Sequence, residues 1–532
     1  MHKTFRTWPW LAAVAIILLA VLLRFWNLGQ TPCGLFGDQA LNGLEVIRGK
    51  ILPYYSFYGE HDEGLFISSL IILSRFIGIG QWQIFAGTAV YGSIVVGLAI
   101  FVIRRLSGDW PLALLSGSFL AVSPWAIALS RNGLRATTAP IFILLAAWTA
   151  YEWSVAGRRF QSLWSFAFGL AIGAGFYSYS AFRAVAPIFL LITLYALLKR
   201  RFFQLLLVIA AASLTLIPLA VAFLHQPAEL TSRAGQVSIF KSGHFSTAAG
   251  LFTANFKGVS LSLLGFGGDW LWRNNLNGEP LLPVFLSPFF LIGLLTLIYK
   301  SIKGSFSSFL IITVFVSFLF PFLFAYDTPP PHDMRLVGEL PIVFGILSFG
   351  LILSFRKLKK IIPPAKYLVF PLALLIPFLA IHSFQLLQMA GIDPRFASEF
   401  QCDHTEIAQS LAGQYANLNS RHIYIIGSLF DRYPIDFLRS IHGLPLTKNL
   451  DPGNLSYETV QKGDLIVAPV YGQFGFYHLD DPSGHTILPW GSQNFLRNLA
   501  LKYPDLRIVD VHYSPTPHRY PQGISFITLM RL

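Results

Sequence analysis

The stretch WPWLAAVAIILLAVLLRFW, Trp8 to Trp26, decides the fold, and GLFGDQALNGLEVIRGK, Gly34 to Lys50, follows it after a short polar break. The first stretch is apolar over about the 20 residues that an α-helix needs to cross a bilayer. A basic N-terminus before an apolar run is also typical of a signal peptide. No small-x-small cleavage site follows, and we interpret the run as a retained helix. The chain therefore places a carboxylate, Asp38, close to the predicted membrane surface.

The composition of the whole chain is that of an integral membrane protein. Its 532 residues are 54% hydrophobic and 12% charged, with a mean hydropathy of +0.57. A soluble chain carries about twice as many charges. Eleven apolar runs predict spanning helices. They are residues 8–26, 83–103, 111–129, 136–154, 162–180, 184–198, 203–224, 281–299, 306–325, 336–355 and 367–388.

The distribution of Lys and Arg predicts the orientation. Alternate short loops between the runs are basic: Lys3 and Arg6, Arg104 and Arg105, Arg158 and Arg159, Lys199 to Arg201, Lys300 and Lys303, and Arg356 to Lys360. Basic loops favour the cytoplasmic side. With eleven spans, the N-terminus is cytoplasmic and the last segment is extracytoplasmic. We expect a multi-pass protein of the cell (inner) membrane, in contact with membrane lipids.

The net charge of +13 does not indicate a nucleic-acid-binding protein. The segment 389–532 holds 11 Lys and Arg against 13 Asp and Glu, so the excess positive charge lies elsewhere, mostly in the basic loops. No basic patch remains for a nucleic-acid partner. The two cysteines, Cys33 and Cys402, both fall outside on this topology. Two outcomes stay open for them, a disulfide or two unpaired thiols.

Four segments on the predicted outer face break the membrane pattern. They are residues 27–82, 225–280, 326–335 and the tail from about 389. The first contains two segments with helical periodicity, DQALNGLEVIRG and EGLFISSLIILSRFIGI, and the second is polar and rich in glycine. The tail alternates the apolar stretches HIYIIG, DLIVAPV, RIVDVHY and ISFITLMRL, which predict strands, with the helical stretches EIAQSLAGQYANL and SQNFLRNLALKY.

These patterns predict a fold class. It is a mainly α, polytopic membrane protein with about eleven transmembrane helices, outer-face juxtamembrane helices and a C-terminal extracytoplasmic α/β domain. We predict a membrane domain over 1–388 and the α/β domain over 389–532.

Several positive side chains lie on the predicted outer face, where the positive-inside tendency does not expect them. They are Arg131 and Arg135 in SRNGLRATTAP, Arg183 in YSYSAFRAVAP, and His332 and Arg335 in PPPHDMRLVGELP. A phosphate at headgroup depth would account for them, since guanidinium groups bind phosphate through two hydrogen bonds. The alternative is an interfacial cation that extends to the headgroups or pairs with an acid. As a set, they favour an anionic lipid ligand.

Acidic residues form the complementary set in the first outer segment. They are Asp38, Glu45, Glu60, Asp62 and Glu63. A carboxylate beside a low-dielectric surface has a raised pKa, which suits it to accept a proton near neutral pH. The alternative, a solvated surface charge, is the stronger interpretation for Glu45 and Glu60.

The motifs together resemble the GT-C class of polytopic glycosyltransferases, in the branch of protein O-mannosyltransferases and lipid A aminoarabinose transferases. The resemblance covers helices one to ten through GDQA, EGLF, AVSPWAIALSRNGLR, GAGFYSYSAFRAVAP and PPPHDMRLVGELP, and bacterial members are similar also around GGDWLWRNNLNGEPLLP. It implies a GT-C-like membrane domain and a donor sugar on a polyprenyl monophosphate. Gln39 stands where many relatives have Glu, which puts in doubt a metal site built on an Asp-Glu pair.

The resemblance also implies roles for residues. Asp38 matches the catalytic aspartate and Glu63 the second acid. The donor-phosphate ligands would be Arg131, Arg135, Arg183, His332 and Arg335. Candidates for acceptor or loop contacts are Asp62, Asp269, Arg273 and Asn275. Glu63 would orient the acceptor or share a divalent cation, Mg²⁺ or Mn²⁺, with Asp38.

The predicted function is that of an inverting glycosyltransferase, which moves one hexosyl or pentosyl unit from a polyprenyl-phosphate donor to a protein, lipid or glycan acceptor outside the membrane. Asp38 would take the acceptor proton while basic groups stabilise the departing phosphate. We expect no nucleotide cofactor, because no glycine-rich phosphate loop stands between a strand and a helix. Two rivals remain, a lipid-linked glycan transporter or flippase and a non-catalytic envelope assembly protein.

Overall fold

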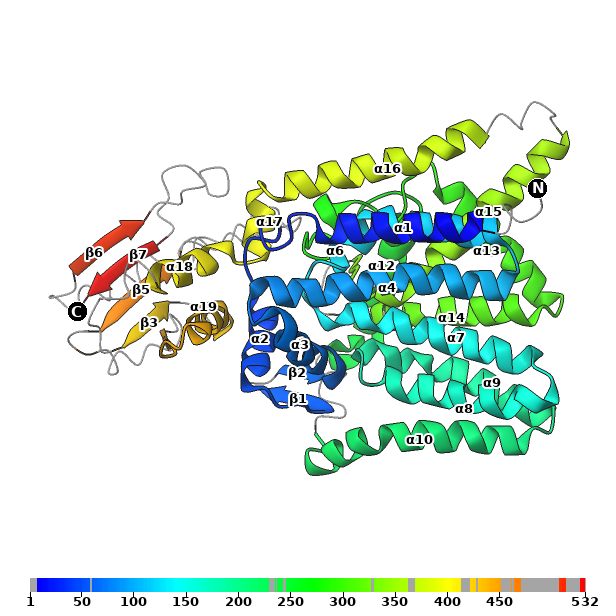
Figure 1. Ribbon diagram of the computed structural model, residues 1–532, viewed down its shortest axis with the longest axis horizontal. Coiled ribbons are helices and arrows are strands. Elements are labelled where there is room, and N and C mark those ends of the chain that lie inside the picture. Colours follow the sequence, from blue (N-terminus) through cyan, green and yellow to red (C-terminus); the bar gives the residue numbers. More distant parts are fainter. Residues whose placement is uncertain are drawn as a thin grey trace. The chain divides into compact units, whose positions relative to one another are not determined.

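The structure is a computed structural model in two compact units. The first comprises Met1–Trp26, Ile51–Ser69 and Ala86–Leu386, and the second comprises Asn27–Lys50, Leu70–Phe85 and Leu387–Leu532. Figure 1 traces the chain through both. The residues that the structure describes are 7–57, 60–228, 235, 237–242, 245–326, 330–361, 369–412, 422–426, 429–450, 461, 464–469, 507–512 and 527–531.

Helices form at all eleven predicted apolar runs. Helix formation satisfies every backbone polar group within the segment, as a bilayer requires. They are α1 (Trp8–Phe25), α4 (Gln81–Ser107), α5 (Trp110–Val122) with α6 (Pro124–Leu129), α7 (Ala139–Val155), α8 (Arg158–Gly175), α9 (Ala186–Leu198), α10 (Phe202–His225), α13 (Ser287–Ile302), α14 (Phe306–Leu323), α15 (Leu340–Ile361) and α16 (Val369–Ala390).

The length and composition of these helices support a membrane protein without fixing the number of spans. Among the described residues, six helical stretches are long and apolar enough to cross a membrane: Trp8–Phe25, Gln81–Ser107, Ser180–Leu198, Phe202–His225, Phe306–Leu323 and Val337–Lys360. Four shorter apolar helices are Gly64–Ile77, Trp110–Val122, Ser287–Ile302 and Leu374–Ala390. The count of eleven spans stays a prediction.

The run predicted at 111–129 is two helices instead of one. Pro124 begins α6, and the Ser123 hydroxyl caps it by accepting a hydrogen bond from the backbone N–H of Ala126 at 3.3 Å. Proline at a first helical turn and serine at the N-cap are the favoured residues there. The break therefore follows from local sequence.

The first outer segment contains both helices predicted for it. They are α2 (Gly37–Arg48) and α3 (Gly64–Ile77), and an antiparallel hairpin of β1 (Tyr54–Phe57) and β2 (Glu60–Glu63) separates them. The predicted loop 225–280 differs, because α12 (Phe245–Leu263) lies within it. Its Asn255 amide donates to the carbonyls of Leu323 and Ala325 at the end of α14, at 3.2 and 2.6 Å. This tertiary contact compensates for a polar, weakly helical sequence.

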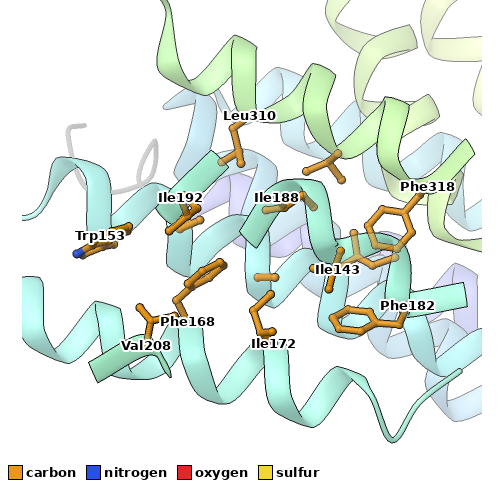
Figure 2. Packing of buried hydrophobic residues seen from close by; sticks show 14 of the residues in the cluster. Ile143, Trp153, Phe168, Ile172, Phe182, Ile188, Ile192, Val208, Leu310 and Phe318 are labelled. Carbon is orange, nitrogen blue, oxygen red and sulfur yellow. The ribbon is translucent and has the colours of Figure 1, made fainter. Parts of the chain in front are cut away.

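The core of the first unit lies between α7, α8, α9 and α14. Figure 2 shows Ile143, Phe168, Phe182, Ile188 and Phe318 converging there, all buried. Close helix packing depends on glycine as well. A Cβ on Gly293 of α13 would lie 2.2 Å from the Ile346 carbonyl oxygen, and one on Gly350 of α15 would lie 1.8 Å from that of Phe289. Small residues permit such backbone contact between membrane helices.

The second unit contains a five-stranded sheet in the order β4-β3-β5-β7-β6. The strands are β3 (Ile423–Ile426), β4 (Lys448–Leu450), β5 (Leu465–Pro469), β6 (Arg507–His512) and β7 (Ile527–Arg531), with β3 parallel to β4 and β5, and β7 antiparallel to β5 and β6. Each of the four predicted strand stretches holds a strand, and β4 is additional.

Three helices of the tail accompany this sheet in the second unit: α17 (Pro394–Glu399), α18 (Cys402–Ala412) and α19 (Leu429–Ile441). The helix predicted in EIAQSLAGQYANL coincides with α18 as far as Ala412. The helix predicted in SQNFLRNLALKY lies outside the described residues. The predicted division at 388/389 remains a prediction.

Candidate functional site

Asp38 lies in the first turn of α2 and is half-buried, whereas Gly37, Gln39 and Ala40 beside it are buried. The backbone N–H of Phe36 donates to Oε1 of Gln39 at 2.6 Å. An acceptor three residues after the N-cap closes the start of a helix in this way. Gln39 therefore has a structural role in α2, and Asp38 is the acid in this turn that remains accessible.

Two further contacts fix α2 within the second unit. Cys33, just before the helix, forms a disulfide with Cys402, and the two Cα atoms are 5.4 Å apart. The ring of Phe437 on α19 occupies the space beside Gly43, where a Cβ would come within 2.5 Å of its Cε2. The disulfide resolves the alternative that the sequence left open for the two thiols.

Asn42 lies one helical turn after Asp38 and was not singled out from the sequence. Its side chain is fully buried, and neither amide atom has a hydrogen-bond partner among the described residues. Buried amides nearly always have partners. The spacing of four residues places Asn42 and Asp38 on the same side of α2. This helical spacing from the predicted acid is the signal that could have found Asn42.

Glu63 and Arg135 are brought together in the first unit. Nε of Arg135 donates to Oε2 of Glu63 at 2.8 Å, and the side chains are 13% and 6% exposed. The guanidinium carbon also lies 5.8 Å from the ring centroid of Tyr179. Glu63 ends β2 and Arg135 begins the 3₁₀ turn before α7. The predicted second acid and a predicted phosphate ligand are thus ion-pair partners.

The other two predicted arginines of these loops have different surroundings. Arg131 is buried, and Nη1 donates to the carbonyl oxygens of Arg24 and Leu23 at the end of α1, at 2.7 and 3.3 Å. Arg183 lies half-buried in the 3₁₀ turn that leads into α9. Arg131 therefore anchors a helix end, while Arg183 keeps an accessible part.

A second cluster joins the loop before α13 to the loop before α15, and Asp269 is at its centre. Oδ2 of Asp269 accepts from Nδ2 of Asn274 at 3.0 Å and from the backbone N–H of Asp333 at 2.8 Å. The carboxylate of Asp333 accepts from Nδ2 of Asn275 at 2.5 Å, and all four residues are fully buried. Burial, and then the neighbouring Asp269, hold the pKa of Asp333 well above its usual range.

His332 belongs to the same cluster, with Nδ1 3.8 Å from Oδ2 of Asp269. Trp125 of α6 completes it by donating from Nε1 to the carbonyl oxygen of Asp333 at 3.1 Å. Arg335 and Arg273 follow or precede members of the cluster by one or two residues in the chain, and both are half-buried. Asp269, Asn275 and His332 are therefore together, and Asp333, Asn274 and Trp125 are members that the sequence did not reveal.

The predicted metal site stays a prediction. Within the described part of the chain, no group of three or more His, Cys, Asp or Glu residues could hold a metal ion. In addition, the Glu63 carboxylate already binds Arg135. The side chain of Asp62 lies outside the described residues, although its backbone pairs with Tyr55 in the hairpin.

The first unit thus holds two groups of charged and polar side chains, the Glu63–Arg135 pair and the Asp269 cluster. The chain shares its fold with two solved structures of one membrane enzyme. The chain is similar in structure to ArnT from Cupriavidus metallidurans bound to undecaprenyl phosphate, with a TM-score of 0.57, 11% sequence identity, and coverage of 100% of this chain and 98% of that one. The apo structure of the same ArnT gives 0.55, with 12% identity and coverage of 99% and 98%.

The S. cerevisiae protein O-mannosyltransferase Pmt1-Pmt2 complex bound to the sugar donor has a TM-score of 0.34 at 16% identity, over 40% of this chain and 34% of that one. No protein-family model matches the sequence, and no curated protein matches it. At 11–12% identity, the likeness to ArnT establishes the fold alone.

Proposed function

We propose that this protein is an inverting glycosyltransferase that moves one sugar from a polyprenyl-phosphate donor to an acceptor on the extracytoplasmic face of the membrane. The observation that carries the proposal is a fold shared along the whole chain with a structure solved with undecaprenyl phosphate. The charged residues of the loops also support it. They supply both an acid and guanidinium groups, the pair that transfer from a lipid phosphate requires.

In this proposal, Asp38 is the general base. Its carboxylate is the accessible acid in a turn whose neighbours are buried, and it sits on a helix that a disulfide and Phe437 hold in place. It would take the proton from the acceptor hydroxyl as the oxygen attacks the anomeric carbon. That attack displaces the lipid phosphate from the opposite side and inverts the configuration.

Arg335, Arg183 and Arg135 are our candidates for stabilising the departing phosphate. Arg135 has a fixed position, because its Nε donates to Oε2 of Glu63, and a guanidinium group suits a phosphate. His332 would assist if protonated. Arg131 is the weakest of the set, since its donors serve backbone carbonyls. We assign Glu63 to positioning Arg135 and the acceptor, because its carboxylate is paired with Arg135.

The Asp269 cluster has a different role in the proposal. Its carboxylates and amides bind one another and the backbone of two loops. It would fix the position of the loop that carries His332 and Arg335 relative to the loop that carries Arg273. Asn275 and Asp269 then act on the donor or acceptor through these loops.

Sugar transfer by the purified full-length protein tests the proposal. Polyprenyl-phosphate hexoses and pentoses are supplied with a membrane extract as acceptor, and the released polyprenyl phosphate is measured. Lipid-extract mass spectrometry of cells with and without the protein then identifies the acceptor that gains one sugar. Movement of a lipid-linked sugar across vesicle membranes without its release would favour a flippase. Neither release nor movement, with the fold intact, would favour an assembly protein.

A further inference from the structure

A cavity of about 280 Å³ lies between α4, α5, α7, α13, α14 and α15, all in the first unit. Apolar side chains such as Leu144, Leu310 and Ile346 form most of its lining. Lys300 is the one charged residue among the described residues that line it, and Ser305, Ser307 and Ser308 lie at the same end. The cavity is therefore apolar in its body and polar at one end, as a binding site for an amphipathic molecule would be.

The polar end is built for an anion. Lys300 lies in the last turn of α13, with Nζ 5.0 Å from the ring centroid of Phe349, which keeps the ammonium beside the cavity. Ser305 caps α14 by accepting from the backbone N–H of Ser308, and its hydroxyl also donates to Oγ of Ser308 at 3.0 Å. The ammonium, the hydroxyls and the positive end of the α14 dipole would all favour a phosphate.

This cavity is separate from the proposed transfer site. The loop that carries Asp269 precedes α13, and Lys300 lies thirteen residues into that helix, about 20 Å along its axis. Lys300 and Lys303 also belong to a loop that we predict to be cytoplasmic. Basic pockets between helices on that side of a membrane bind anionic lipid headgroups.

We propose that this cavity binds an anionic phospholipid, with one acyl chain between the helices and the phosphate on Lys300 and the α14 serines. A bilayer phospholipid fits better than the polyprenyl-phosphate donor, because the donor phosphate is needed at the opposite helix ends. The bound chain would fill a gap between α13, α14 and α15. The site does not depend on sugar transfer, so it can be tested even if the proposed function is wrong.

Lys303 offers a matched control for Lys300. It carries the same charge in the same turn but does not line the cavity, and its Nζ lies 5.8 Å from the ring centroid of Tyr299. Native mass spectrometry of the purified full-length protein would measure binding of phosphatidylglycerol and phosphatidylcholine. For Lys300→Gln, we expect phosphatidylglycerol to bind about fivefold more weakly, the effect of one lysine near the lipid surface. For Lys303→Gln, we expect binding close to that of the parent.

Gly345→Leu tests the acyl-chain part of the site. Gly345 lines the cavity, and a Cβ there would lie 3.5 Å from Ile103, so a longer side chain can grow into the space. Leucine is also a better helix former than glycine, so α15 should be retained. We expect this variant to lose bound phosphatidylglycerol. Equal weakening by Lys300→Gln and Lys303→Gln, unchanged binding in Gly345→Leu, or a Lys300-dependent preference for undecaprenyl phosphate would each overturn the proposal.

Discussion

Glu63 and Arg135 form a buried ion pair although 72 residues separate them: Nε of Arg135 lies 2.8 Å from Oε2 of Glu63. Because both side chains are largely removed from water, neither charge is well solvated without the other. Loss of one partner from such a pair costs about 3–5 kcal/mol of stability.

Glu63→Gln and Arg135→Gln should therefore each lower the unfolding midpoint of the detergent-solubilised protein strongly. The double variant should lose much less than the sum of the two, because no unpaired charge remains. Thermal unfolding of all three variants measures this coupling. Additive losses would show that the pair has no mutual stabilisation. Recovery of Glu63→Gln activity by added Mn²⁺ would contradict the positioning role and point to a shared cation.

Arg335 and Arg131 should respond differently to the same substitution. In Arg335→Lys, the planar fork is lost while the charge remains, and donor affinity should fall by about tenfold, the value of one charged hydrogen bond. Arg335→Ala should bind more weakly still. Arg131→Lys should instead lower stability, because Arg131 binds the carbonyl oxygens at the end of α1. Titration with polyprenyl-phosphate sugar and thermal unfolding separate the two effects, and equal donor affinity in Arg335→Ala and the parent would place the phosphate elsewhere.

Asp333 should make stability depend on pH. Its pKa is raised in the folded protein by burial and by Asp269, so above the ordinary pKa of about 4 the unfolded chain releases a proton that the folded protein keeps. Stability then falls as pH rises from about 4 toward the raised value. Asp333→Asn mimics the protonated acid and can still accept from Asn275. The difference in unfolding midpoint between Asp333→Asn and the parent should therefore shift in favour of the variant as the pH rises from about 4 to 7. A difference that does not change with pH would mean that Asp333 is ionised in the folded protein.

The helices could be predicted from the sequence, because backbone hydrogen bonding in lipid leaves a long apolar run little choice. Apolar runs alone did not predict every helix boundary, because single residues set some of them. Ser123 and Pro124 divide one run into α5 and α6. α12 escaped prediction because its serines, threonines and glycines are weak helix formers, and its Asn255 depends on carbonyls about 70 residues away.

The residues of the candidate site could be predicted from the sequence, but the contacts between them could not. Asp38, Glu63 and Arg135 are recognisable by charge and by place. That Glu63 meets Arg135, or that Cys33 meets Cys402 across 369 residues, depends on how the helices pack. The Asp269 cluster was hidden for the same reason, since Trp125 and Asp333 contribute to it through an indole N–H and a backbone carbonyl.

Gly43 should be intolerant of any side chain. A Cβ there would lie 2.5 Å from Cε2 of Phe437, and overpacking of this kind costs about 1–3 kcal/mol. Gly43→Ala should lower both stability and kcat, because α2 carries Asp38. Phe437→Leu should relieve part of the loss in the double variant. Gly80→Ala is the control, since no atom lies within 4 Å of a Cβ at that position, and a Gly43→Ala protein equal to it would show that α19 does not constrain α2.

Asp38→Asn addresses the chemistry itself. The replacement is nearly isosteric and the side chain is half-buried, so folding and donor affinity should change little. Loss of a general base lowers the rate by about 10²- to 10⁴-fold, and the loss should appear in kcat with donor binding retained. Asp109→Asn is a suitable control, because Asp109 pairs with Arg356 in predicted cytoplasmic loops, with Oδ2 2.5 Å from Nη2. It should keep the parental kcat. If Asp38→Asn transfers sugar at the parental rate while Glu63→Gln does not, the base is Glu63, and Arg135 would then act by holding that carboxylate in place.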